Sequence, residues 1–597
     1  MGGKTVRIGC GSGFWGDSAM AAPQLVHGGG IDYLVSDYLA EVTMSILAKA
    51  RAKRPDAGYA TDFVTVTMAG LLRDIARQGI KVVSNAGGIN PLACRDALQL
   101  LLDEAGVTLS IAVVLGDDLT GRAGEFRAAG VREMFSGAAF PAEIMSANAY
   151  LGGRPIADAL DRGADIVITG RCVDSAVTLG PLMHEFGWRD GDLDQLAAGT
   201  LAGHIIECGP QCTGGLFTDW RRVGGWENIG YPIVEVEPDG GFILSKPPET
   251  DGLICFGSVA EQLLYEIGDP GAYVCPDVTC DFTRVEMAEV GENLVRVTGA
   301  RGLPPTATYK VSATYSDGYR NQALLVIGGA EAAAKARATA ETVLARTRKM
   351  FAARNLGDYS ETRIECVGAE AMFGAAGNDG SREVVMKLAV RHDSMEALNI
   401  FAREFAPAGT SMAPGTMGFG GGRPSPGPVV GMFSFLVEKA AVPVSVVLGE
   451  QAFPCALPTA GGFTVSASET TRAVPAQPVT GETVSVPLIK LCYGRSGDKG
   501  DNANVGLIAR RAEYLPVLRA QVTTDRVRAH FAHVCQGAVE RYDLPGIGGM
   551  NFVLHQALGG GGMASLHTDN LAKAYAQVLL AMEIEVPAAW AAELAAA

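Results

Sequence analysis

One stretch decides the fold of this chain: it reads DIVITGRCVDSAVTLGPLMHEFGW over residues 165–188 and AGHIIECGPQCTGG over residues 202–215. The apolar run Asp165–Thr169 predicts a short buried strand, and the glycine after it predicts a turn into a polar loop. A helix is expected from about Leu193. The stretch therefore places a buried strand beside the side chains best suited to chemistry, which are Arg171, Asp174, His204, Glu207 and Cys208.

The order of strand, small polar loop and helix recurs along the first 228 residues. This repetition is typical of a parallel sheet covered on both faces, so we predict a doubly wound α/β domain. In such sheets ligands bind at the carboxyl ends of the strands. We therefore expect one site shared by five loops: Gly11–Asp17, Ser36–Asp37, Ser84–Asn90, Gly116–Asp118 and Gly170–Ser175. Within them the predicted ligand-binding residues are Gly11, Gly13, Asp17, Asn85, Gly87, Gly88, Asn90 and Ser175.

The pattern changes after residue 228, where short strands broken by proline and glycine turns replace the regular alternation. We interpret residues 229–465 as an α+β middle domain and the polar, proline-bearing residues 466–483 as a linker. Residues 484–597 exchange strands and helices around an expected antiparallel sheet, which suggests a small ferredoxin-like domain.

Composition restricts the classes of partner. The chain of 597 residues carries a formal net charge of −16, which argues against nucleic-acid or acidic-membrane binding because either needs a basic face. Its N-terminus lacks the apolar run of a secretory signal, and no window is long enough to span a membrane. The twelve cysteines show no disulfide-framework spacing. We expect a cytoplasmic protein.

The first loop carries Gly11, Gly13 and Gly16 in the spacing G-x-G-x-x-G. That spacing matches the dinucleotide-binding template, but an isolated glycine fingerprint is a weak signal. A tight strand-to-helix turn is the favoured interpretation. A nucleotide-dependent enzyme stays as a third alternative, and it requires this loop to open a proper helix.

Arg171 and Asp174 follow directly after the buried strand. A guanidinium there could clamp a carboxylate or a thioester-derived oxyanion, and Asp174 could act as a general base. An internal ion pair that stabilises the loop explains the same two residues equally well.

His204, Cys208 and Cys212 share a helical spacing of four residues. Gly209-Pro210 interrupts the helix and no CxxC accompanies them, so we predict no metal site. A cysteine nucleophile assisted by His204 is chemically reasonable, although buried structural cysteines are common. We prefer His204 and Glu207 as the acid/base pair.

The tail loop over residues 495–502 places two cations and several polar groups between two strands, and a run of four glycines follows at 559–562. Free backbone N–H groups in such loops accept anions, so we predict a phosphate or carboxylate site, with CoA as a source of the phosphate. The alternative is a structural turn in which the cations neutralise the carboxylates. The predicted ligand-binding residues are Arg495, Ser496, Asp498, Lys499, Asp501 and Asn502.

Six motifs together resemble the acyclic terpene utilisation (AtuA-type) family: GSGFWGD, SNAGGINP, GADIVITGRCVDSA and AGHIIECGPQCTGG, and in the tail RSGDKGDNANVG and ALGGGGMASLHTDN. The resemblance covers nearly the whole chain and includes the family's C-terminal ferredoxin-fold domain. It implies catabolism of branched or terpenoid acids as CoA thioesters, in association with acyl-CoA carboxylases and hydratases. It implies no catalytic residue.

Residues and resemblance together predict an enzyme that acts on a branched or terpenoid acyl-CoA, or the related carboxylic acid, by acid/base chemistry of the hydratase or C–C lyase type. The alternative is a noncatalytic acyl-CoA-binding protein or an assembly partner of an acyl-CoA carboxylase. We expect no required cofactor, with CoA entering as part of the substrate, and we expect a homo-oligomer.

Overall fold

The computed structural model describes residues 3–418, 420, 422–463, 476–562 and 564–596. Its largest sheet has five parallel strands at the centre, which are almost fully buried. They run side by side in the order β1 (Val6–Cys10), β2 (Tyr33–Ser36), β3 (Lys81–Ser84), β6 (Ile166–Thr169) and β4 (Ile111–Leu115). The strand predicted at the start of the deciding stretch is confirmed as β6.

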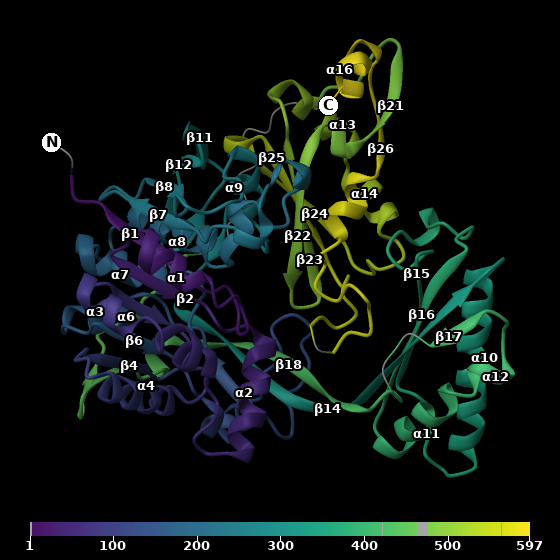
Figure 1. Ribbon diagram of the computed structural model, residues 1–597, viewed down its shortest axis with the longest axis horizontal. Coiled ribbons are helices and arrows are strands. Elements are labelled where there is room, and N and C mark those ends of the chain that lie inside the picture. The colour runs from purple at the N-terminus through teal and green to yellow at the C-terminus, as the bar shows by residue number, and fades with distance from the viewer. Residues whose placement is uncertain (1–2, 419, 421, 464–475, 563, 597) are drawn as a thin grey trace.

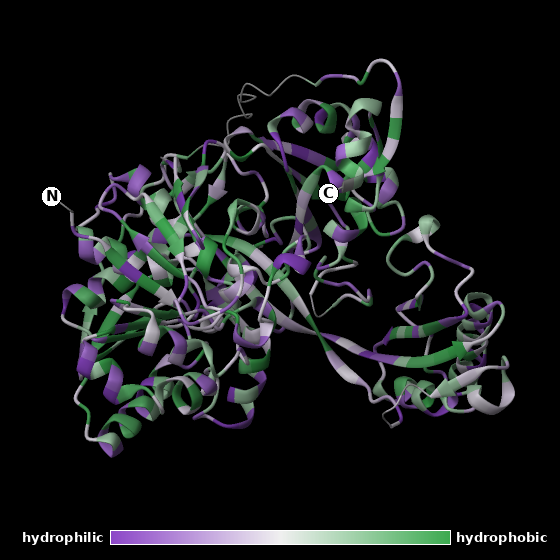
Figure 2. Ribbon diagram, turned by 45° about the horizontal axis from the view of Figure 1, so that its top comes forward, coloured by the Kyte–Doolittle hydropathy of each residue, from purple (hydrophilic) through white to green (hydrophobic). Residues whose placement is uncertain are grey.

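Helices cover both faces of this parallel core (Figure 1). One face packs against α1 (Ala21–Gly28), α2 (Glu41–Lys53), α3 (Leu72–Gln78) and α4 (Pro91–Ala105). The other packs against α5 (Ala123–Ala128), α6 (Arg154–Asp161), α7 (Ala176–Phe186) and α8 (Leu193–Ile206). In Figure 2, hydrophobic residues dominate the strands inside this part of the molecule. Apolar runs in the sequence therefore became strands buried on both sides.

The sheet as a whole is mixed, which corrects the prediction of a doubly wound parallel sheet. Antiparallel strands extend one edge through β7 (Ile233–Val236), β8 (Phe242–Ser245), β12 (Leu294–Thr298) and β11 (Glu286–Gly291). The other edge is extended by β19 (Ser445–Leu448) and β20 (Gln451–Pro454). The boundary expected after residue 228 falls inside this hydrogen-bonded sheet, because long-range strand pairing leaves no local mark in a sequence.

A second sheet is organised by β14 (Thr308–Gly328), a strand of 21 residues. Its first half pairs with β5 (Ser146–Ala149) and β18 (Gly427–Glu438), and its second half pairs with β16 (Glu383–His392) and β17 (Thr416–Gly418). β15 (Glu361–Val367) completes this sheet beside β16. Figure 1 shows β14 and β18 running from the N-terminal body into a smaller lobe, where α10 (Ala332–Ala352), α11 (Met395–Phe405) and α12 (Ala408–Ser411) lie.

The C-terminal domain is built on a four-stranded antiparallel sheet in the order β22 (Cys492–Lys499), β23 (Asn502–Ala509), β25 (Gly549–Leu554) and β24 (Val539–Leu544). The first and last strands of the domain, β21 (Thr483–Pro487) and β26 (Glu583–Pro587), form a separate antiparallel pair. The helices are α13 (Leu515–Gln521), α14 (Thr524–His530), α15 (Tyr575–Leu580) and α16 (Ala591–Ala596). Of the predicted linker, residues 466–475 lie outside the described residues.

Two buried asparagines join this domain to the N-terminal body. Asn504 donates to the Leu264 carbonyl at 2.6 Å, and Asn551 donates to the carbonyls of Ile267 and Gly268 at 2.8 and 2.7 Å. The acceptors follow α9 (Phe256–Leu263), which packs on β22 and β23. A short sheet of β9 (Tyr273–Val274), β10 (Thr279–Asp281) and β13 (Arg301–Leu303) continues from there. Because these bonds are buried, they fix how the C-terminal sheet sits on the body.

No helix among the described residues is long and apolar enough to cross a membrane.

Asn551→Ala should destabilise the protein, because it leaves two buried carbonyls without a donor. The expected loss is about 1–3 kcal/mol, visible as a lower midpoint of thermal unfolding in calorimetry. Gln99→Ala on the exposed face of α4 is the control and should leave the midpoint unchanged. Equal midpoints for Asn551→Ala and the parent would show that these bonds do not hold the domains together.

Candidate functional site

The carboxyl ends of the parallel strands carry a buried polar network. Asp37, just after β2, accepts hydrogen bonds from the Asn85 amide and from the Leu39 N–H. Asn85, just after β3, in turn accepts from the Tyr38 N–H at 2.8 Å. Burial raises the pKa of Asp37 well above its ordinary value, and the nearby Asp174 raises it further, although Arg171 opposes both. Two of the five predicted loops therefore meet here.

Arg171 lies at the centre of these loops with a side chain that is 4% exposed. Its guanidinium donates to the Leu39 carbonyl at 3.0 Å and to Asp174 at 2.8 Å, and it stacks over the Tyr150 ring at 4.2 Å. The Arg171 N–H donates to Asp117 at 2.8 Å. The structure thus brings Arg171 and Asp174 together as an ion pair, while 35% of the Asp174 side chain stays accessible to solvent.

Glu41 begins α2 beside this pair, and the sequence analysis missed it. The Tyr150 hydroxyl donates to its carboxylate, and the Lys310 ammonium lies 3.6 Å away. Burial opposes the charge of Glu41, but Lys310 and Arg171 together hold its pKa below the ordinary range. Its place at the start of a helix directly after a strand end was a usable signal. Lys310 comes from β14, and no motif in the sequence around it indicated a role at the site.

His204 and Glu207 adjoin the same cluster at the end of α8. The His204 Nε2 lies 3.2 Å from the Leu263 carbonyl, so we assign the ring proton to Nε2. Burial and the charge of Lys499 together lower the pKa of His204 to about 4, although its hydrogen bond to the Leu263 carbonyl opposes them. The ring is therefore neutral, and its Nδ1 lone pair lies 3.3 Å from the Glu207 carboxyl.

Glu207 is held in its protonated form. Burial and the charge of Asp174 raise the pKa of Glu207 well above its ordinary value, although Lys499 and Arg171 lower it in part. A carboxylic acid that faces an imidazole lone pair can share a proton with it. The two acid/base candidates thus lie 3.3 Å apart at these atoms, although the His204 Nδ1 makes no hydrogen bond among the described residues.

Lys499 reaches this cluster from the C-terminal domain, at the end of β22. Desolvation lowers the pKa of Lys499, but the carboxylates of Glu266, Asp174 and Glu41 outweigh it and raise the pKa. Its side chain is exposed, and among the residues that the structure describes none lies within hydrogen-bond or ion-pair distance of its ammonium group. The tail loop and the opening stretch therefore contribute to one site, and Lys499 offers it an unoccupied cation.

A second group of charges surrounds Lys499. Lys573 contacts the Tyr265 hydroxyl and lies 3.3 Å from Glu266 and 3.7 Å from Asp498. Burial and the charge of Glu266 raise the pKa of Asp498 to about 7, which Lys573 opposes. Glu266, Tyr265 and Lys573 were not predicted, because they stand far apart in the sequence and carry no motif.

The other predicted tail residues hold the fold. Arg495 donates to the Leu216 carbonyl at 2.9 Å and to Gln211 at 2.5 Å, and the Ser496 hydroxyl donates to the Ala572 carbonyl at 2.6 Å. Asp501 accepts from the Gly560 N–H, and Asn502 accepts from the Gln556 N–H. The two glycine-rich loops of the tail are therefore in contact. The charge of Lys499 lowers the pKa of Asp498 in part, as the structural-turn alternative expects, and the ligand roles of the four residues stay predictions.

Protein atoms pack closely against the glycines of the first loop, Gly11–Asp17. A Cβ added at Gly13 would lie 2.7 Å from the carbonyl carbon of Cys208, and one added at Gly11 would lie 2.9 Å from Leu34. Asp17 accepts from the Gly13 N–H and from the Tyr231 hydroxyl, and α1 begins only at Ala21. The loop opens no helix of its own, so the tight-turn interpretation holds over the nucleotide alternative.

The remaining predicted ligand residues also make internal contacts. Asn90 donates to the Pro55 and Ala57 carbonyls, and Gly87 and Gly88 approach backbone so closely that a Cβ would collide with it. Ser175 packs against Gly203 of α8. Their ligand roles stay predictions.

Cys208 is the weakest of the catalytic candidates. Burial raises the pKa of the Cys208 thiol well above its ordinary value, and burial raises the pKa of Cys212 as well. A thiol kept protonated is a poor nucleophile. In the described part of the chain, no group of three or more His, Cys, Asp or Glu side chains is arranged to hold a metal.

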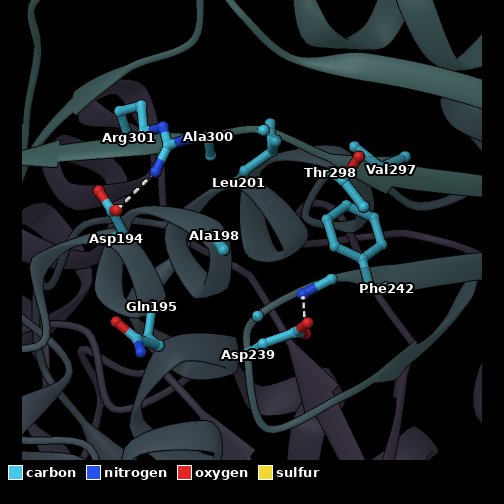
Figure 3. A pocket seen from close by; sticks show the side chains of 13 residues that line it. Asp194, Gln195, Ala198, Leu201, Asp239, Phe242, Val297, Thr298, Ala300 and Arg301 are labelled. Carbon is cyan, nitrogen blue, oxygen red and sulfur yellow. Dashed lines mark hydrogen bonds and ion pairs between the residues drawn. The ribbon is translucent and has the colours of Figure 1, made fainter.

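A cavity of about 310 Å³ lies elsewhere, between the start of α8 and the turns around β8, β12 and β13 (Figure 3). Its charged pair, Asp194 and Arg301, is solvent-exposed and joined at 2.8 Å. The pKa of Asp194 is lowered by the Gly302 N–H and by Arg301. We define the strand-end cluster as Asp37, Glu41, Arg171, Asp174, Glu207 and Lys499. Several of these groups have strongly shifted pKa values, unlike the charged pair of the cavity, so we take the cluster as the candidate site.

Comparison with known proteins agrees with the motifs. A family model described as acyclic terpene utilisation family protein AtuA matches residues 6–448, and one described as the AtuA ferredoxin-like domain matches residues 486–585. Comparisons with curated proteins and with solved structures found no match.

Glu207→Gln should stabilise the protein near pH 7. A carboxyl whose pKa is raised in the folded state destabilises it once the pH exceeds the unfolded value, about 4.3, so the gain should vanish as the pH falls to that value. Glu41→Gln is the matched opposite: its pKa is lowered in the folded state, so the substitution should lower the thermal midpoint at pH 7. Thermal unfolding measured from pH 4.5 to 8 tests both signs, and a destabilised Glu207→Gln at pH 7 would contradict the assigned protonation.

Proposed function

The chain belongs to the acyclic terpene utilisation (AtuA) family, and we propose that it is a catabolic enzyme acting by acid/base chemistry on branched or terpenoid acyl-CoA thioesters or the related carboxylic acids. The reaction class that we propose is hydration or carbon–carbon bond cleavage.

The observation that carries this proposal is the contrast between two nearby carboxyl groups, Glu207 and Asp174. Burial and the charge of Asp174 raise the pKa of Glu207 well above its ordinary value, whereas Asp174 is partly exposed and lies 2.8 Å from the Arg171 guanidinium. Environments that push the pKa values of neighbouring titratable groups apart are how enzymes assign an acid and a base within one site. Addition of water and cleavage at a β-hydroxy carbon both need a general acid, a general base and a group that stabilises negative charge on the carbonyl oxygen.

In this proposal Glu207 is the general acid. In dehydration it donates its proton to the departing hydroxyl group, which leaves as water. In the reverse hydration the Glu207 carboxylate accepts the proton that the attacking water loses. The His204 Nδ1, 3.3 Å from the Glu207 carboxyl, can relay that proton. Asp174, which is partly exposed and charged against Arg171, is the base that faces solvent and substrate. Arg171 positions Asp174, because its other hydrogen bond is already made to Leu39.

We propose that the ammonium group of Lys499 stabilises the negative charge that develops on the substrate carbonyl oxygen. Hydratases and C–C lyases that act next to a thioester or carboxylate carbonyl build negative charge on its oxygen. An ammonium group that has no partner among the described residues and lies among carboxylates can stabilise that charge. Because Lys499 belongs to the C-terminal domain, catalysis would need both domains in place.

A panel of branched enoyl-CoA and 3-hydroxyacyl-CoA thioesters, with the free acids alongside, tests the proposal by mass spectrometry. At least one should be converted. Glu207→Gln should lower kcat by roughly 10²- to 10⁴-fold, and Lys499→Gln should lower kcat/KM by roughly 10²- to 10³-fold.

Glu341→Gln and Lys349→Gln, both exposed on α10, are the matched controls and should retain parental activity. If the folded protein binds acyl-CoA but converts nothing, the noncatalytic alternative replaces this proposal: an acyl-CoA-binding or assembly partner of an acyl-CoA carboxylase. If it neither binds nor converts any member of the panel, both the enzymatic proposal and the noncatalytic alternative are rejected.

A further inference from the structure

A row of cations lies on one face of the sheet formed by β14, β15 and β16. Side chains alternate along a strand, so apolar residues such as Leu388 point to the face that α10 and α11 cover. The opposite face carries Arg320, Arg363, Lys387 and Arg391, together with Glu361 and Glu365. Arg363 donates to Glu365 at 2.8 Å.

The strand register sets two of these cations directly opposite each other. Arg320 of β14 pairs with Arg391 of β16, and like charges at opposed positions destabilise a sheet. Burial and the charge of Arg391 lower the pKa of Arg320. Arg391 is compensated by Asp317 and, at 3.7 Å, by Glu361. The register therefore gathers positive charge on this face of the sheet, in a chain whose net charge is −16.

The C-terminal domain closes over this face. Lys387 donates to the Leu566 carbonyl at 2.8 Å and to the Thr568 hydroxyl at 3.2 Å, and Arg320 lies 3.4 Å from the Ser565 carbonyl. Glu365 joins the two sides, since it accepts from Lys387 at 3.1 Å and from Thr568 at 2.6 Å. The loop and the sheet face are therefore locked together by buried charge-assisted bonds.

Two further groups complete the surroundings. Lys49 comes from α2, and its pKa is lowered by burial, by Arg320 and by Lys53. It makes no ion pair or hydrogen bond with any residue in the described ranges. His567 comes from the C-terminal loop, where burial and Arg363 lower its pKa to about 4, so its ring is neutral and can donate or accept.

We propose that Lys49, Arg320, Arg363 and His567 form a phosphate-binding site for the phosphorylated adenosine end of CoA. The identity of the ligand rests on the proposed function, whereas the affinity for phosphate rests on the cations alone. Arginine forks match phosphate oxygens in two-point geometry, and a bound phosphate would relieve the repulsion between Lys49, Arg320 and Arg391.

One helix links this site to the strand-end cluster. Glu41 begins α2 and Lys49 stands eight residues later, about 12 Å along the helix axis. A Cβ built on Gly562 in the tail would lie 4.0 Å from Val42 of the same helix, so the glycine loop borders the space between them. An extended pantetheine arm can cover such a span, which places the thioester beside Lys499 and the phosphates beside Lys49.

Isothermal titration calorimetry with adenosine 3′,5′-bisphosphate tests this inference without any turnover. The wild-type protein should bind it, adenosine should bind far more weakly, and Lys49→Gln and Arg320→Gln should each weaken binding roughly tenfold. Lys349→Gln on α10 and Arg403→Gln on α11, exposed beyond the opposite face of the sheet, are the matched controls and should bind like the parent.

Glu207→Gln should bind the bisphosphate normally, so loss of turnover and loss of phosphate binding can be told apart. A thermal midpoint equal to that of the parent will show that Lys49→Gln is folded. This is expected, because Lys49 makes no ion pair or hydrogen bond with the described residues. The inference is overturned if the wild type does not bind the bisphosphate, if adenosine binds equally well, or if Lys49→Gln and Arg320→Gln both bind like the parent. In any of these cases the proposed acid/base function would still stand on the panel assay.

Discussion

Burial of charge at the ends of parallel strands is the constraint on which the rest of this molecule depends. The sheet forces Asp37, Asp174 and Glu207 into one small volume, where their mutual repulsion and the loss of water raise the pKa of Asp37 and of Glu207. Arg171 offsets part of this, but its hydrogen bonds to Leu39 and Asp174 leave it little capacity for a ligand. Burial and neighbouring charges therefore favour the protonated forms of Asp37 and Glu207, and sites of this kind are suited to proton transfer.

The C-terminal domain completes this arrangement instead of standing apart from it. Buried amide bonds from Asn504 and Asn551 to the carbonyls after α9 set the position of its sheet, and that position brings the end of β22 to the strand ends. Lys499 thereby supplies the cation that Arg171 cannot. The same domain closes over the charged face of the β14 sheet through Glu365 and Lys387. The strand-end cluster and the charged face of the β14 sheet thus depend on one docking geometry, and the phosphate site that we propose would lie between that face and α2.

Much of the candidate site could be read from the sequence because it follows strands. Strand ends are marked locally by apolar runs that stop at glycine or at a polar residue, and this marking located Asp37, Asn85, Arg171 and Asp174. The helix expected from about residue 193 places His204 one turn from Glu207, and the His204 Nδ1 lies 3.3 Å from the Glu207 carboxyl; their acid/base roles stay predictions. Glu41, Lys310, Glu266 and Lys573 were missed because each comes from a different element, and only the folding of distant segments brings them to the cluster. Arg495 of the glycine-rich tail loop donates to Gln211 and to the Leu216 carbonyl, and its predicted ligand role stays a prediction.

The sequence by itself determined the parallel core, the existence of a ferredoxin-like C-terminal domain and the family, because periodicity and long motifs are local properties. Tertiary structure alone decided that strands from beyond residue 228 join the first sheet, since hydrogen bonding between strands depends on contacts hundreds of residues apart. It also decided which charged groups are ionised. The pKa of Glu207 or Glu41 depends on burial and on neighbouring charges in space, and neither is written in the order of the residues.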